Sequence, residues 1–381
     1  MASERKLKLY FVVGEESGDI LGSKMIETFA ELDSPIEPVG LGGERMREKG
    51  VNSLFNISEL SVMGISGVLR QLPNLLKRIR QTVEDVVKQK PDMLLLIDSP
   101  EFSYRVAKQV RKRLPQVKIV KYVAPSVWAW RPGRARKISA YVDHVLAILP
   151  FEPDLLAELG GPPATYVGHP LSANMPEVDA KSKRKSSETP KLLILPGSRK
   201  SETKRLLPFL RETLEILKQR GNSFEVTLPA VERLENEIRS EVTSWSVSVN
   251  VVSGDEAKTK AFLEADIALA ASGTVTLELA LHKVPMISIY KLDGLAMQIR
   301  HMLTGWTASL PNLVADYPVV PERFNEYAHP HYVARMVERL VMDDHERKLQ
   351  LKGFELVRKR LQQQSPSHQL AAEKILDLAN S

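Results

Sequence analysis

The stretch LLILPGSRKSE, Leu192–Glu202, joins an apolar run to a turn of small and charged residues. Its first four residues predict a buried strand, a Pro-Gly pair ends that strand, and the apolar pattern that begins at Leu206 predicts a helix. The turn presents the hydroxyl of Ser198 and the guanidinium of Arg199. Backbone N–H groups and the positive end of a helix meet at such a connection, so we expect it to bind an anion. Taken alone, the stretch fits a surface turn with Arg199 in an ordinary ion pair equally well.

Short apolar runs alternate with helical patterns on both sides of this stretch, which is the pattern of a parallel sheet covered by helices on both faces. In the first half, strands are predicted at Leu7–Val13, Met93–Asp98, Lys118–Val123 and His144–Leu149, with helices at Asp19–Leu32 and Tyr104–Leu114. In the second half, strands are predicted at residues 191–195, 224–230, 247–252, 266–271 and 285–290. From about His331 the chain is predicted to be helical.

A polar segment flanked by prolines, residues 175–190, predicts a linker between two domains. It separates an N-terminal Rossmann-like domain, residues 1–174, from a C-terminal one, residues 191–345, and a helical tail follows at 346–381. Sheets of this kind bind ligands at the carboxyl ends of their strands. We therefore predict an α/β fold of two doubly wound domains facing a cleft, with the C-terminal helices packing back on the first domain. This is the glycosyltransferase B architecture.

Composition limits the classes of function. The chain of 381 residues suits two domains, and its lack of cysteine excludes disulfides, thiolate metal sites and cysteine catalysis. A formal net charge of +6 favours an anionic partner, such as a membrane surface, a phosphorylated substrate or nucleic acid. The sequence shows no zinc-ligand spacing and no RNA-binding aromatic motif, so we expect no nucleic-acid partner.

The first residues carry charges followed by a short apolar run that leads directly into a glycine loop. We interpret this run as the first strand rather than a signal peptide, because no small-residue cleavage site follows it. No stretch of the sequence is long and apolar enough to span a bilayer.

A second turn, inside ALAASGTVTLELAL (Ala268–Leu281), repeats the order strand, small-residue turn, helix. Gly273 and Thr274 would present backbone N–H groups to a phosphate, and Glu278 lies one helical turn beyond Thr274. A carboxylate there can accept both hydroxyls of a ribose. The alternative is an ordinary helix start with a Glu of no function. Two anion-binding turns in one domain predict a nucleotide diphosphate.

Two stretches of the first half supply carboxylates. VVGEESGDILG (Val12–Gly22) is not a G-x-G-x-x-G motif, and its acidic residues argue against a dinucleotide phosphate. Glu15, Ser17 and Asp19 suit sugar hydroxyls, although Ser17 or Asp19 would also serve as a helix N-cap. Asp98 ends a predicted buried strand, where it would act as a general base or cap the following turn.

Two further stretches suggest contacts with a lipid-linked sugar. In YVAPSVWAWRPGRARK (Tyr122–Lys137), Trp128 can stack on a sugar ring and Arg131 can hold a phosphate. Alternatively, Trp128 is part of a buried pair of tryptophans and Arg131 is part of a basic loop in solvent. Glu59–Arg80 mixes apolar residues with cations, as in proteins that rest on an anionic membrane. An amphipathic core helix is the commoner explanation of that mixture. The candidate membrane contacts are Val62, Met63, Val68, Leu69 and Leu72.

Eight motifs follow one another between Val12 and Leu313: GEESGDILG, ELSVMGI, IDSPEF, YVAPSVWAWR, GHPL, LPGSR, ASGTVTLE and SLPNL. Together they resemble the bacterial lipid-A-disaccharide synthase family. The resemblance implies a metal-independent, inverting transfer of 2,3-diacylglucosamine from UDP-2,3-diacylglucosamine to 2,3-diacylglucosamine 1-phosphate. The products would be UDP and the β-1,6-linked disaccharide 1-phosphate that begins lipid A. The absence of a D-x-D motif agrees with a diphosphate site without metal, and no cofactor is expected.

The resemblance also implies residue roles and a location. Asp98 would take the proton of the acceptor's 6-hydroxyl, and the UDP would be held by Ser198, Arg199, Gly273, Thr274, Glu278 and Asn312, the last from the other side of the cleft. Glu15, Ser17 and Asp19 would line the sugar region. The enzyme would associate peripherally with the cytoplasmic face of the inner membrane. The sequence is compatible with a homodimer but does not decide the oligomeric state, and it does not decide the preferred acyl-chain length.

One position departs from the family pattern. The family often has Leu-Gln-Glu where this chain has Phe324-Asn325-Glu326, so the amide of Asn325 is one methylene shorter. The alternative functions are a UDP-N-acetylglucosamine 2-epimerase-like enzyme on the same fold and a non-catalytic UDP-sugar sensor.

Overall fold

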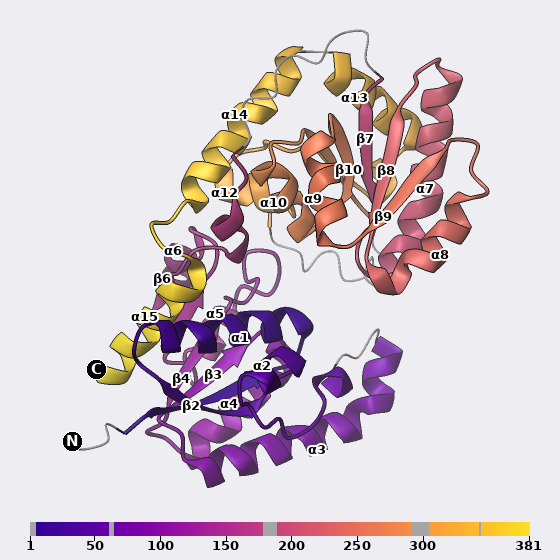
Figure 1. The fold of residues 1–381 in the computed structure, drawn as a ribbon. Coiled ribbons are helices and arrows are strands. Elements are labelled where there is room, and N and C mark those ends of the chain that lie inside the picture. Colours follow the sequence, from indigo (N-terminus) through magenta and orange to yellow (C-terminus); the bar gives the residue numbers. More distant parts are fainter. Residues whose placement is uncertain (1–4, 61–64, 178–188, 292–304, 343) are drawn as a thin grey trace. The chain divides into compact units, whose positions relative to one another are not determined.

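The computed structural model describes residues 5–60, 65–177, 189–291, 305–342 and 344–381, without the side chains of residues 65–71, 174 and 344. The chain forms two compact units (Figure 1). Unit 1 combines Met1–Ala173 with Gln363–Ser381, and unit 2 is Asn174–Gln362. Each unit is a parallel sheet with helices on both faces. No helix among the described residues is long and apolar enough to cross a membrane.

The sheet of unit 1 has six parallel strands in the order β2-β1-β3-β4-β5-β6. Its strands are β1 (Leu7–Val13), β2 (Ile36–Leu41), β3 (Met93–Ile97), β4 (Lys118–Tyr122), β5 (His144–Ala147) and β6 (Ala164–Tyr166). All five residues of β3 are buried, as expected for the centre of a sheet that helices cover on both faces. The predicted strands of this half are confirmed, whereas β2 and β6 were not predicted. The prolines and glycines around the latter two hid their apolar pattern.

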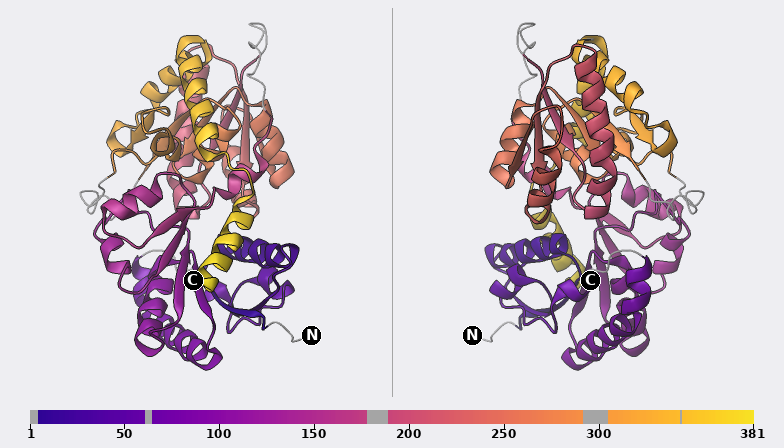
Figure 2. Two further views of the ribbon diagram at one scale, coloured as in Figure 1. Left: turned by 90° about the vertical axis from the view of Figure 1, so that its left-hand side faces the viewer. Right: turned by 90° about the vertical axis from the view of Figure 1, so that its right-hand side faces the viewer.

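The helices of unit 1 form two layers. They are α1 (Glu16–Glu31), α2 (Glu44–Glu48), α3 (Ile65–Gln89), α4 (Pro100–Arg113), α5 (Arg134–Ile138), α6 (Glu152–Glu158) and α15 (Ser367–Asn380), with 3-10 turns η1 (Ile57–Leu60) and η2 (Pro170–Asn174). Alternate residues of β1 point to opposite faces. Leu9 and Phe11 pack with α1 and α15, while Tyr10 and Val12 pack with α3 and α4. The helices α1 and α15, from opposite ends of the chain, therefore lie side by side on one face (Figures 1 and 2).

The sheet of unit 2 also has six parallel strands, in the order β12-β11-β10-β7-β8-β9. Numbered within the unit, this is the 3-2-1-4-5-6 order of nucleotide-binding Rossmann folds. The strands are β7 (Lys191–Leu195), β8 (Glu225–Ala230), β9 (Val249–Ser253), β10 (Ile267–Ala271), β11 (Met286–Tyr290) and β12 (Glu322–Phe324). The helices are α7 (Lys200–Gln219), α8 (Glu232–Val242), α9 (Asp255–Glu264), α10 (Thr274–Leu281), α12 (Leu310–Ala315), α13 (Pro330–Met342) and α14 (Asp344–Leu361), with the 3-10 turn η4 (Asn325–Tyr327).

Two predicted boundaries need correction. Helix α7 begins at Lys200, six residues before the predicted start, and accommodates Pro208 in its interior. Its first turn is stabilised by Glu202, whose Oε2 accepts the backbone N–H of Arg199 at 3.3 Å. The predicted C-terminal tail consists of two helices in different units. Only α15 packs on unit 1, because Gln350 on α14 hydrogen-bonds both the N–H and the C=O of Met286 in β11.

Candidate active site

Each sheet has one topological switch point, where the strand order reverses. In unit 1 it lies between the paired strands β1 and β3, and in unit 2 between the paired strands β7 and β10. Ligands of open α/β sheets bind beyond the carboxyl ends of strands at such points. The four turns that follow these strands are GEES, DSP, PGSR and SGT, the four stretches in which the sequence predicts ligand contacts. The topology thus brings the predicted residues of each unit together in pairs of neighbouring turns.

The two turns of unit 1 are in direct contact through Asp98. Its Oδ2 accepts a hydrogen bond from the Ser17 hydroxyl at 2.7 Å. Asp98 and Ser99 both have left-handed backbones, with φ of 54° and 42°. Left-handed conformation costs a non-glycine residue roughly 1–2 kcal/mol. A Cβ on Gly14 would lie 2.2 Å from the Ser99 hydroxyl oxygen, so only glycine allows the first turn to approach the second.

A buried lysine that sequence reasoning missed supports this turn. Lys121 of β4 is 2% exposed, and its Nζ donates to the backbone carbonyl of Asp98 at 2.8 Å. Burial lowers the pKa of Lys121 to about 8, and the negative charges of Asp98 and Glu15 limit the fall. The signal was present in KIVKYV, where one charged residue interrupts an apolar strand.

Asp19 has a structural role within unit 1, and its predicted sugar contact stays a prediction. It is 4% exposed, and its carboxylate accepts the backbone N–H groups of Gly43, Arg45 and Met46 at 2.8 to 3.2 Å. These bonds cap the start of α2 and fix the loop that follows β2. The N-cap of α1 is Glu15, so neither Ser17 nor Asp19 caps that helix. Glu15 and Ser17 are exposed at the switch point and remain candidates for sugar hydroxyls.

The tryptophan stretch lies beyond β4. Trp128 is half-buried and packs edge-on against Phe151, with ring centroids 6.3 Å apart. The guanidinium of Arg131 lies 4.0 Å from the ring centroid of Trp130, and Arg131 has a left-handed φ of 52°. Trp128 thus packs within unit 1, while Arg131 carries its charge on an aromatic surface. A contact of either residue with substrate stays a prediction.

In unit 2, the turn after β7 gathers cations around backbone groups. Gly197 has φ of 103°, and a Cβ there would lie 2.5 Å from the Glu202 carboxylate, so the turn requires glycine. The Arg199 side chain is 67% exposed and its Nη1 contacts Glu202 Oε1 at 2.9 Å. The Arg233 guanidinium, which the sequence analysis did not single out, donates to the Ser198 carbonyl at 2.9 Å.

The turn after β10 leaves its backbone open. Gly273 has φ of 147°, and a Cβ there would meet no atom within 4 Å. The next residue, Thr274, is exposed and begins α10, so its N–H is one of the donors that a helix start leaves without an intrahelical partner. Glu278, one turn further, forms an ion pair with Lys258 of α9. The geometry suits an anion at the turn, with Glu278 held in place beside it.

The predicted nucleotide contact of Asn312 is not supported by its surroundings. Asn312 is 1% exposed. Its Oδ1 accepts the N–H groups of Val319 and Val320 at 2.9 and 2.7 Å, and its Nδ2 donates to the Val320 carbonyl at 3.0 Å. The amide is therefore used inside unit 2, where it holds the segment before β12 against α12. Asn325, the position that departs from the family pattern, opens the turn η4 with φ of 38°.

The candidate membrane surface is described only in part. Val62 and Met63 lie outside the described residues, as do the side chains of Val68 and Leu69 on α3. Leu72 is half-buried, and Leu76, one turn along, is 50% exposed. The interleaved cations have mixed roles, because Arg78 pairs with Glu59 at 2.7 Å whereas the Arg80 side chain is 82% exposed.

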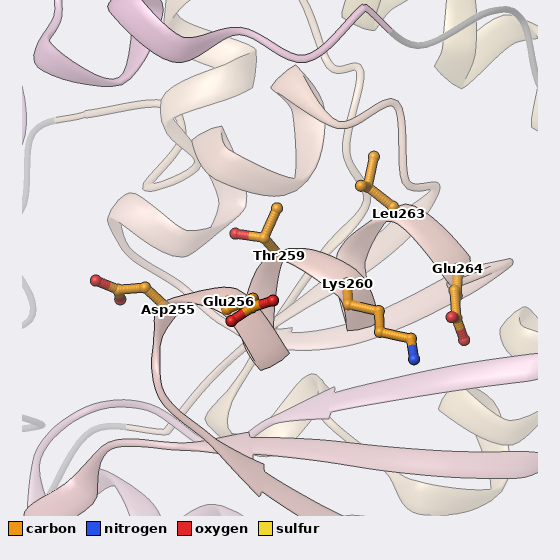
Figure 3. A pocket seen from close by; sticks show the side chains of 6 residues that line it. All are labelled: Asp255, Glu256, Thr259, Lys260, Leu263 and Glu264. Carbon is orange, nitrogen blue, oxygen red and sulfur yellow. The ribbon is translucent and has the colours of Figure 1, made fainter.

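Other places in the described chain offer less chemistry. No group of three or more His, Asp or Glu residues in the described ranges is arranged to hold a metal ion. A shallow depression runs along α9 and is lined by Asp255, Glu256, Thr259, Lys260, Leu263 and Glu264 (Figure 3). All six come from one helix and none belongs to the four turns. We therefore assign the candidate active site to the turns at the switch points.

Comparison with known proteins identifies the family. The lipid-A-disaccharide synthetase family model matches residues 9–376. The lipid-A-disaccharide synthase of Rhodopseudomonas palustris strain HaA2 is 45% identical over 352 residues, covering 91% of this chain and 90% of that protein. A second, from strain ATCC BAA-98 / CGA009, is 43% identical over 382 residues, covering 98% and 97%.

The solved structures that resemble this chain share its fold at low identity. Acinetobacter baumannii MurG has a TM-score of 0.62 at 14% identity, covering 99% of both chains. The Methanocaldococcus jannaschii UDP-GlcNAc 2-epimerase has a TM-score of 0.57 at 13% identity, also covering 99% of both. These likenesses confirm the glycosyltransferase B type of fold, and the sequence relatives favour the transferase over the epimerase-like alternative. The chain belongs to the lipid-A-disaccharide synthase family of glycosyltransferases.

Proposed function

We propose that the enzyme transfers 2,3-diacylglucosamine from UDP-2,3-diacylglucosamine to 2,3-diacylglucosamine 1-phosphate, with Asp98 as the general base. The observation that carries this proposal is the geometry at the end of β3. A carboxylate stands at the switch point of unit 1 on a left-handed backbone and is oriented by the Ser17 hydroxyl. Strained backbone persists at functional sites when the surrounding structure holds it in place.

The chemical step follows from these groups. The acceptor's 6-hydroxyl oxygen forms a bond to C1 of the donor sugar while the bond from C1 to the UDP oxygen breaks. The electron pair of that bond leaves with UDP, and the hydroxyl proton passes to the Asp98 carboxylate. Attack from the face opposite UDP inverts the configuration at C1. A positioned base contributes about 10²–10⁴-fold to such a proton transfer.

The turns of unit 2 would receive the UDP. Open N–H groups at Gly273 and Thr274 and the exposed guanidinium of Arg199 offer donors and positive charge to a diphosphate. The epimerase structure named above was solved with UDP-GlcNAc and UDP, which supports a UDP-sugar at this fold. As the glycosidic bond breaks, negative charge grows on UDP, so donors fixed there stabilise the transition state more than the ground state.

Peripheral membrane association is the second part of the proposal. Both substrates carry acyl chains, so the enzyme has to meet them at a lipid surface. Helix α3 supports this because an exposed Leu76 lies on the same helix as the exposed cation Arg80. Flotation with anionic vesicles should weaken with salt and when Val68 and Leu69 are changed to Ser. Flotation that is indifferent to both changes would contradict membrane association.

Incubation with both lipid substrates, followed by mass spectrometry, tests the reaction itself. We expect the disaccharide 1-phosphate and one UDP for each disaccharide formed. UDP binding without any product from either acylated substrate would instead favour the UDP-sugar sensor.

A further inference from the structure

Lys121 is a charged residue at the centre of a sheet. In the parallel register it lies between Leu96 of β3 and Val145 of β5, both of which are fully buried. Burying an ammonium group is costly unless its charge and its N–H donors find partners. In the described part of the chain no carboxylate forms an ion pair with Lys121. A buried charge of this kind rarely adds to stability, so we expect another role for Lys121.

The hydrogen-bond partner of this ammonium is the backbone of the candidate base. Nζ of Lys121 donates to the Asp98 carbonyl at 2.8 Å, and the Ser103 hydroxyl lies 3.1 Å from the same oxygen. That carbonyl lies in the turn whose two residues, Asp98 and Ser99, are left-handed. The Ser103 hydroxyl, which has one proton to donate, lies closer to the Ser99 carbonyl, at 2.9 Å. The charged donor Lys121 therefore offsets part of the conformational cost of the turn. A hydrogen bond from a charged donor is stronger than one from a neutral donor, so it can offset the cost of a left-handed backbone.

We propose that Lys121 is a positioning residue, which holds the Asp98 carbonyl and thereby fixes the left-handed turn that keeps the Asp98 carboxylate beside Ser17. The inference rests on the proposed role of Asp98 as base. Lys121 itself touches neither substrate nor the reacting atoms. It acts through the place of the carboxylate, and a reacting group displaced by about 1 Å can cost 10²-fold in rate.

The proposal has a consequence for pH. Three groups face the ammonium: Asp98 from the turn after β3, Glu15 from the turn after β1, and the Tyr104 ring from α4, whose centroid is 6.0 Å from Nζ. Burial raises the pKa of Tyr104, so its hydroxyl stays neutral where Lys121 titrates. Burial lowers the pKa of Lys121 to about 8. Above that pH the amine loses its charge and the hydrogen bond weakens, so kcat should fall as pH rises through about 8.

A double-mutant cycle tests the inference. Lys121→Met should lower kcat about 10- to 100-fold while KM changes less than about threefold, because the turn and not substrate affinity is altered. In an Asp98→Asn background, Lys121→Met should have no further effect on kcat, since no base is left to position. Equal losses in both backgrounds would overturn the inference. Near wild-type turnover of Asp98→Asn would instead overturn the proposed base, which separates the two failures.

Two further variants guard against a folding artefact. Lys118 lies on the same strand but donates to the Ser381 hydroxyl, at 3.0 Å, and not to the turn that carries Asp98. Lys118→Met should therefore leave kcat unchanged. Lys121→Arg keeps the charge at all working pH values. We expect it to recover part of the activity lost in Lys121→Met and to abolish the fall of kcat near pH 8. An Arg variant that still loses activity at that pH would show that the titration belongs to another group.

Discussion

At the switch point of unit 1 the left-handed residues are Asp98 and Ser99, whereas at that of unit 2 the positive φ angles belong to Gly197 and Gly273. Both pairs of turns occupy the same place in their sheets. Glycine adopts such angles without strain and leaves the backbone N–H groups uncovered. A residue with a side chain adopts them only at an energetic cost, which is retained where the side chain itself is needed.

This difference separates two kinds of chemistry. Unit 1 presents a carboxylate that Ser17 orients, and the buried Lys121 holds the backbone carbonyl of the same residue. This arrangement suits proton transfer. Unit 2 presents bare N–H groups and the exposed guanidinium of Arg199, which suit the charge of a diphosphate. A side chain should therefore be decisive in unit 1, and backbone conformation should matter more in unit 2.

The largest effect is expected from Asp98→Asn. The amide keeps the size of the side chain and its capacity to accept the Ser17 hydrogen bond, but it cannot take a proton. We expect kcat to fall about 10²–10⁴-fold. UDP affinity should be unchanged, because the turns that we propose bind UDP belong to unit 2. The measurement is kcat beside a UDP dissociation constant on the same preparation, and loss of both would make Asp98 a structural residue.

Arg199→Ala should lower kcat by roughly two to three powers of ten, the usual effect of removing one donor from a developing negative charge. The matched control is Lys200→Ala, since Lys200 is the neighbouring exposed cation and pairs with Glu237 at 2.8 Å. That control should change kcat less than about threefold. Full turnover of a folded Arg199→Ala protein would show that Arg199 only forms an ordinary surface ion pair.

Glu152 contrasts with Asp98 within unit 1, because its buried carboxylate serves the fold and not the reaction. It accepts the N–H groups of Ile148 and Leu149 just after β5 at 3.2 and 3.0 Å. Burial raises its pKa from about 4.5 to about 7. The folded protein then holds a proton that the unfolded chain releases, so this residue makes stability fall as pH rises from about 4.5 to about 7.

Glu152→Gln should remove that dependence. Relative to wild type, the variant should gain on the order of 3 kcal/mol of unfolding free energy between pH 4.5 and pH 7, with a flat difference outside this window. Urea denaturation at several pH values measures it. A constant difference at every pH would show that Glu152 has the same pKa in the folded and the unfolded protein.

Gly273→Ala should have the smallest effect on the reaction. At φ of 147° and ψ of −163° an alanine is strained, so the turn has to shift and its N–H groups move from the diphosphate. We expect UDP affinity to fall about tenfold, which corresponds to about 1.4 kcal/mol. Gly221→Ala is the control: it also has a positive φ, of 81°, and space for a Cβ, but it lies after the end of α7. It should lower stability to a similar degree and leave UDP affinity unchanged.

The sequence predicted the strands that frame both switch points, because continuous apolar runs bounded by glycine and proline turns are a strong local signal. Asp98, Ser198 and Gly273 lie in the turns directly after those strands, so the strand prediction alone was enough to place them. The start of α7 was missed because its first turn is polar and is stabilised by Glu202, a contact that depends on the fold of the turn.

Side-chain roles were harder to predict, since they depend on partners far away in the sequence. Asp19 caps α2 through Gly43 and its neighbours, and Asn312 is used by the backbone near Val320. Neither contact leaves a periodic pattern. Lys121 was missed for a different reason: it was visible as a charge in an apolar strand, but its partner is a backbone carbonyl, which no residue identity reveals.

The return of α15 to unit 1 has a consequence for the order in which the protein is finished on the ribosome. Ala371, Ala372 and Ile375 are fully buried in the same core as Leu9 and Phe11. Residues 174–362 of unit 2 are synthesised as one continuous segment before these three. Domains generally fold as units during synthesis. The core of the half that carries Asp98 is therefore complete only once the last helix of the chain has been made.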